Sequence, residues 1–225
     1  MLVLALKVLL APALVTAATL AGRRWGAAVS GVVTALPLVA GPILAIIAIE
    51  HGRVFGATAA RATLLGIVAL SAFCVAFARA AEAGWRWPAA LGIGWVAYGL
   101  VGAVVSRVDV APGWGLAAAL ASLAAAALLI RAPPPGTAPA HPPPAWDLPA
   151  RAGLPAALVL AVTGAAGALG PALSGVLTPF PIATSVLAAF TLAQNGAAAA
   201  RGMLAGFVRA LPGLALCFFV VALLL

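Results

Sequence analysis

The chain of 225 residues is 65% apolar and only 7% charged, with a mean hydropathy of +1.21. Soluble domains are about 45–50% apolar and about 25% charged, so this composition excludes a water-facing globule. The net charge of +8 comes from basic residues scattered singly between apolar runs. That distribution excludes a nucleic-acid-binding face and is typical of the loops of a protein embedded in a lipid bilayer.

The apolar runs are long and are separated by Gly, Pro and Arg, which favours helices over the short alternating strands of a membrane barrel. About 20 helical residues cross the hydrocarbon core. We therefore expect an all-α, polytopic helical bundle with about eight transmembrane helices. The predicted spans are residues 2–21, 27–49, 55–79, 88–106, 113–130, 153–170, 172–193 and 200–225.

A proline-rich segment divides the predicted helices into two groups. Residues 131–150 contain eight prolines, which prevent a helix and favour an extended linker. We expect five spans within residues 1–130 and three within 151–225. A docking motif for a proline-binding partner is the alternative interpretation of the linker. We also expect His141 and Asp147, which lie in this segment, to be solvated.

The basic residues predict an orientation. The loops on one side hold eight Lys and Arg residues, including Arg23, Arg151 and Arg201, whereas the other side holds four. The positive-inside rule places the richer side, with the proline-rich linker, in the cytoplasm. We expect the inner (cytoplasmic) membrane of a bacterium. Five of the six tryptophans (Trp25, Trp85, Trp87, Trp114 and Trp146) fall near predicted span ends, where interfacial aromatic residues are common.

An internal repeat is the most informative feature of the sequence. With a shift of 144 residues, residues 10–52 align with 154–196 without a gap, and 16 of the 43 positions are identical. The densest block reads SGVVTALP in the first copy and SGVLTPFP in the second. After a four-residue deletion the match resumes with Arg61/Arg201, Leu64/Leu204 and Gly66/Gly206. The first copy covers residues 10–79.

The repeat relates spans one to three to spans six to eight. Because five spans separate equivalent positions, the second copy enters the membrane from the opposite side, which makes an inverted repeat. Secondary transporters use this symmetry to alternate between inward-open and outward-open states. The sequence therefore predicts a permease for a small solute. The alternative is a non-transporting membrane subunit, that is, a scaffold or assembly factor of a larger membrane complex.

Two proline-interrupted spans, the second and the seventh, suggest where the solute binds. Proline removes a backbone hydrogen bond, and freed carbonyls in hydrocarbon must face protein or a wet cavity. Hydroxyl side chains lie beside the interruptions at matching positions. The predicted substrate-binding residues are Ser30, Thr34, Pro37, Ser174, Thr178, Pro181, Thr184 and Ser185. The alternative is that these hydroxyls bond their own helix carbonyls.

Three ionisable residues are candidates for a charge relay or counter-ion. Glu50 and His51 end the second predicted span and could relay protons, although Gln194 and Asn195 replace them in the second copy. Arg209 lies within the last span and could either reach the interface or balance an anionic substrate. The scarcity of acids favours a neutral, amphipathic or anionic solute.

Other functions find little support. The chain has no zinc-binding, nucleophile-elbow or phosphate-loop motif, so we expect neither an enzyme nor a metal or other cofactor. Small residues at spacings such as Gly22–Gly26 and Gly202–Gly206 would allow close helix packing, and with it a homo-oligomer.

The run SGVLTPFPIATSVLAAFTLAQNG, followed by a glycine-spaced last helix, resembles the helix pairs of the drug/metabolite-transporter (EamA-like) family. The resemblance covers mainly residues 174–206 and, more faintly, 30–66. It implies a transporter fold with inverted repeats. That family uses five helices in each repeat, so the second unit here would lack its last two. The segment GRRWG with the later LP…GP helix also resembles bacterial multi-pass proteins, a likeness that implies no function.

Overall fold

The computed structural model describes residues 2–36, 53–108, 110–131, 146–151, 153–157 and 181–224. Within these ranges every regular element is an α-helix, as the composition predicts. The helices are α1 (Leu2–Trp25), α2 (Ala27–Ala35), α4 (Arg53–Glu82), α5 (Trp87–Val105), α6 (Pro112–Leu129) and α9 (Ile182–Leu224). Residues 147–151 and 153–157 are also helical.

Part of the predicted site lies outside the described residues. This holds for Pro37, Glu50, His51, Ser174 and Thr178, for most of the proline-rich linker, and for residues 158–180 of the second repeat copy. The prediction of a midplane site shared by both copies is therefore not tested at Ser174 or Thr178, the second copy's counterparts of Ser30 and Thr34.

Several described helices are apolar and long enough to fit an integral membrane protein. By length and composition, four of them could cross a membrane: Ala60–Glu82, Trp87–Val105, Pro112–Leu129 and Ile182–Leu224. The middle two match the predicted spans closely because proline stands in the first turn of each, where its missing amide hydrogen costs nothing. The count of eight spans and the inverted repeat remain predictions.

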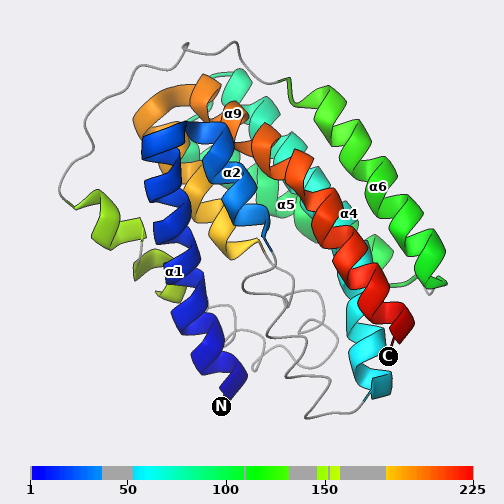
Figure 1. Cartoon of the computed structure of the whole chain (residues 1–225). Helices are drawn as coiled ribbons and strands as arrows, with labels where there is room; N and C mark the ends of the chain where they lie inside the picture. The colour runs from blue at the N-terminus through cyan, green and yellow to red at the C-terminus, as the bar shows by residue number, and fades with distance from the viewer. Residues whose placement is uncertain are drawn as a thin grey trace.

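Three of the described glycines have positive φ where the chain reverses between helices, one of them Gly84 in the turn between α4 and α5. Gly26 (φ 94°) separates α1 from α2, and Gly196 (φ 78°) interrupts α9 between the seventh and eighth predicted spans. A side chain at such a φ is strained, so glycine suits these positions. Figure 1 shows the result for α9: the ribbon ascends, bends, and descends to the C-terminus as a second helical segment.

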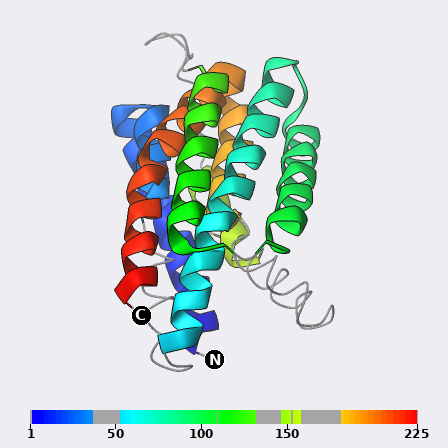
Figure 2. The ribbon, with the colours of Figure 1, turned by 90° about the vertical axis from the view of Figure 1, so that its right-hand side faces the viewer.

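The core forms around α4, which contacts α5, α6 and α9. Its fully buried Phe73 and Phe77 lie with ring centroids 6.0 Å apart. Gly94 of α5 faces the ring of Phe73 so closely that an added Cβ would lie 2.8 Å from it. Figure 2 shows α6 between the descending segment of α9 and α4 in that view, with α5 on the other side of α4.

Charged side chains collect near the end of the bundle where α4 finishes. Glu82, the last residue of α4, accepts from Arg201 of α9 at 3.0 Å and from Arg79 at 3.4 Å. The marked chain ends lie at the opposite end of the bundle (Figure 1). This arrangement agrees with the grouping of Arg79 and Arg201 on one side of the membrane.

Candidate solute-binding site

A cavity of about 310 Å³ lies between α5, the first segment of α9 and the short helical stretch after residue 146. Four aromatic side chains from these three elements form much of its wall: Trp87, Trp95, Trp146 and Phe190. Leu91 and Leu154 add aliphatic surface. The volume is at the lower end of the range for small-molecule sites, which are typically apolar with a few polar groups.

Two polar side chains, Ser185 and Gln194, face this apolar cavity. The indole Nε1–H of Trp95 donates to Ser185 Oγ at 3.0 Å, which ties α5 to α9. Ser185 is fully buried, so this bond lies within the contact between the two helices. Both residues lie on the α9 segment that ends at Gly196, so movement at the bend would displace them together.

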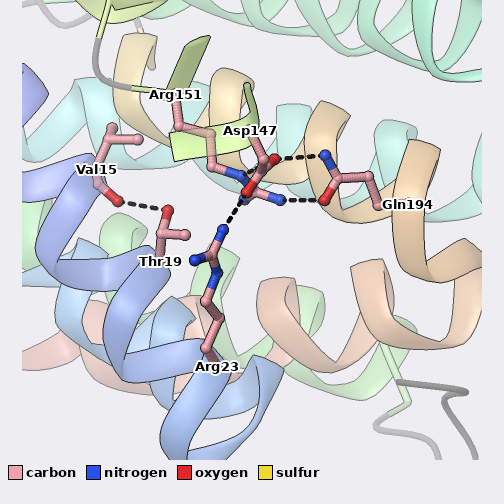
Figure 3. Close-up of polar contacts among 6 residues, drawn as sticks. All are labelled: Val15, Thr19, Arg23, Asp147, Arg151 and Gln194. Atoms are coloured by element: carbon pink, nitrogen blue, oxygen red, sulfur yellow. Dashed lines mark hydrogen bonds and ion pairs between the residues drawn. The ribbon is translucent and has the colours of Figure 1, made fainter. Parts of the chain in front are cut away.

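A buried ionic cluster adjoins the cavity and joins three elements (Figure 3). Asp147 is fully buried and receives hydrogen bonds from Arg23 of α1 at 2.7 Å and from Arg151 at 2.8 Å. Gln194 donates to the same carboxylate through Nε2 and accepts from Arg151 at 3.0 Å through Oε1. Gln194 therefore belongs to both the cluster and the cavity wall.

The environment of Asp147 holds it in the ionised state. Burial alone would raise the pKa of this carboxyl, but hydrogen bonds from Arg151, Gln194 and Arg23, with the charge of Arg151, lower the pKa below its ordinary value. Burial lowers the pKa of Arg151, an effect that the bond to Asp147 opposes. The guanidinium of Arg151 also lies 4.8 Å from the ring centroid of Phe190, a cation–π contact that links the cluster to the cavity.

The described members of the predicted site separate into two groups. Ser185 faces the cavity, and Thr184 and Pro181 are buried nearby at the start of α9. Ser30 and Thr34 are buried on α2, which packs against α1 and α9, and the Thr34 hydroxyl donates to the Ser30 carbonyl at 2.7 Å. For Thr34, the structure therefore agrees with the alternative interpretation, in which the hydroxyl bonds a carbonyl of its own helix.

The last described candidate, Arg209, is exposed on the descending segment of α9. Exposure suits a side chain that extends toward the membrane surface, the first of the two interpretations of this residue.

The expectation that Asp147 is solvated is wrong. It begins a helical stretch, and Arg151, four residues later, lies on the same face and pairs with it. The i,i+4 spacing of opposite charges was a detectable sign, as was the rarity of acids, because Asp147 is one of four in the chain. Its partners Arg23 and Gln194 are 124 and 47 residues away and carry no comparable local pattern.

No protein-family model, curated protein or solved structure matches this chain. The likeness to drug/metabolite transporters accordingly stays a prediction from the sequence.

Proposed function

We propose that the protein is an integral membrane permease for a small solute, and that the tryptophan-lined cavity is its binding site. The observation that carries the proposal is the cavity itself, which joins an apolar wall to the polar groups of Ser185 and Gln194. Three separate elements build it, so their relative movement can open or close it.

The course of α4 and α9 gives further support. The repeat aligns Arg61 with Arg201 and Leu64 with Leu204, and both leucines are fully buried. α4 and the descending segment of α9 run in opposite directions (Figures 1 and 2), and α4 packs against α9. Opposite direction is what an inverted repeat requires of equivalent helices, and alternating access would follow from it.

The proposal places the arginine-rich end of the bundle in the cytoplasm of a bacterium. It assigns the charge cluster a supporting role, because Asp147, Arg23 and Arg151 satisfy one another. Solute contact falls to the aromatic residues and Gln194.

Access to the cavity from both sides of the membrane tests the proposal. Ala189 faces the cavity, whereas its neighbour Ala188 is fully buried in the core and serves as the matched control. Each would be changed to cysteine in a background with Cys74→Ala and Cys217→Ala. Right-side-out and inside-out vesicles would then be treated with an impermeant methanethiosulfonate.

A permease predicts that the cysteine at position 189 reacts in both vesicle types and that the one at 188 reacts in neither. Reaction at 189 from one face only, or from neither, would overturn the permease in favour of the scaffold. Reaction at 188 equal to that at 189 would also overturn it, since the cavity would then not be a distinct accessible space.

A further inference from the structure

We infer that the cavity takes a small aromatic solute that is uncharged or anionic, and that it rejects organic cations. This inference names the solute class of the site in the proposed function, and for transport it rests on that proposal. As a statement about binding it stands on three features of the cavity: its aromatic wall, the charge of the adjoining cluster, and the amide of Gln194 beside that cluster.

The aromatic wall suits a flat ring. Trp87 and Trp95 come from α5, Trp146 from the stretch before Asp147, and Phe190 from α9. Trp146 and Phe190 are themselves in contact, with ring centroids 6.3 Å apart and planes inclined at 58°. Rings placed around a cavity in this way can stack on or meet edgewise with a ligand ring, which adds to the gain from apolar burial alone.

Aromatic cages also bind organic cations, so the local charge decides between the two ligand classes. Two arginines, Arg23 and Arg151, surround the single carboxylate of Asp147, which leaves the cluster with a net charge of +1. Among the described lining residues none is charged. The guanidinium of Arg151 already lies over the Phe190 ring and occupies the face that a cationic solute would otherwise contact.

The amide of Gln194 orients the solute. Gln194 faces the cavity and contacts both Asp147 and Arg151, so the positive potential of the cluster reaches the cavity at this residue. Ser185 lies about two and a half turns earlier on the same segment, where its buried hydroxyl accepts from Trp95. A solute with a carboxylate, hydroxyl or carbonyl therefore turns that group toward Gln194 and its ring toward Trp87 and Trp95.

Three probes that share a phenyl ring and differ in charge test the inference: phenylacetate, 2-phenylethanol and phenethylammonium. The full chain would be reconstituted in phosphatidylcholine nanodiscs, and binding measured by equilibrium dialysis at pH 7. We expect phenylacetate and phenylethanol to bind, and phenethylammonium to bind roughly tenfold more weakly, the order expected for one unit charge near a site of effective dielectric about 20. Cyclohexylacetate, with the same charge but no aromatic ring, should bind several-fold more weakly than phenylacetate.

Removal of one arginine tests the origin of the discrimination. Arg23→Gln makes the cluster neutral without changing the cavity wall, and the cation should then approach the anion in affinity. Arg24→Gln is the matched control, because this substitution changes the net charge by the same amount. Arg24 is exposed and lies over the ring of Trp25, outside the cluster. Arg23→Lys keeps the charge and should retain the discrimination, which separates charge from loss of folding.

Equal binding of the cation and the anion would overturn the inference, as would equal effects of Arg23→Gln and Arg24→Gln. Tighter binding of cyclohexylacetate than of phenylacetate would replace the aromatic solute with an aliphatic one. Uptake of labelled phenylacetate into proteoliposomes separates this inference from the permease. Selective binding without uptake would refute transport and leave the solute class standing. Uptake without charge discrimination in binding would support transport and refute the solute class.

Discussion

Gly31 of α2 and Gly206 of α9 each face the backbone of the other helix where the two helices pack together, and neither position has room for a side chain. A Cβ at Gly31 would collide with the backbone carbonyl of Met203, and one at Gly206 would collide with the carbonyl of Ala28. Backbone lies against backbone at both points. The crossing is thus held by close van der Waals packing, which suits a membrane setting where apolar burial gives no advantage over lipid.

Alanine at either crossing position should destabilise the protein. Because the obstructing atoms belong to backbone, Gly31→Ala or Gly206→Ala must force the helices apart, at a cost of about 1–3 kcal/mol or more. Gly99→Ala is the matched control, since a Cβ there meets nothing within 4 Å and alanine favours a helix. Thermal unfolding in detergent should show a lowered Tm for the first two variants only. Equal Tm values for all three would contradict the close crossing.

The helices of the middle of the chain could be predicted from the sequence. The spans 88–106 and 113–130 agree with α5 and α6 within a residue, because prolines and charged residues punctuate the apolar runs. The small-residue spacing of Gly202–Gly206 was also visible. The helix that packs against this face, α2, could not be predicted. A repeat of small residues marks a face that can pack closely but does not indicate which helix will contact it.

The site was predictable only in part. Ser185 was found because it lies just past the prolines of the repeated block. Trp87 and Trp146 were interpreted as interfacial, and they are indeed half-exposed at helix ends, but they also line the cavity. The ionic cluster depends on contacts between residues far apart in sequence, which periodicity cannot reveal.

Removal of the Asp147 charge should be costly. Asp147→Ala leaves the buried guanidinium of Arg151 without its carboxylate, and breaking a buried ion pair in this way costs about 3–5 kcal/mol. Glu82→Gln is the control, because the Glu82–Arg201 pair is more than a quarter exposed on both sides and should contribute about 1 kcal/mol or less. Denaturation in detergent measures both. A loss for Asp147→Ala no larger than that for Glu82→Gln would show that the cluster is dispensable.

Acid should weaken the protein through the same carboxylate. The pKa of Asp147 is lower in the folded protein than its ordinary value of 3.8, so its contribution is complete above that pH and is lost as the pH falls toward the folded-state pKa. The Tm difference between the native chain and Asp147→Asn should therefore be constant from pH 7 to about 5 and shrink below about 4. A difference that is unchanged at pH 3 would contradict the lowered pKa.

The bond between Trp95 and Ser185 should be measurable as a coupling energy. Trp95→Phe keeps an aromatic ring but removes Nε1, and Ser185→Ala removes the acceptor. Each should reduce the stability by a similar amount, and the double variant should lose less than the sum, with a coupling of about 0.5–1.5 kcal/mol. Additive losses would mean that the two side chains do not interact across the α5–α9 contact.

Sidedness labelling should place the two ends of α5 on opposite faces of the membrane. Ala83 is exposed in the turn before α5, Ser106 is exposed after it, and Asn195 stands beside the Gly196 bend. The ion pair of Arg201 with Glu82 indicates that Asn195 and Ala83 share one end of the bundle. Single cysteines at these three positions, with Cys74 and Cys217 replaced, would be exposed to an impermeant maleimide in intact cells.

If the arginine-rich end is cytoplasmic, only the cysteine at position 106 should be labelled until the cells are opened. Labelling at 83 and 195 but not at 106 would reverse the orientation while preserving the topology. Labelling of 83 and 195 from different sides would be the more serious result. It would separate α4 and α9 at the end where Glu82 and Arg201 pair, and the antiparallel relationship that supports alternating access would be lost.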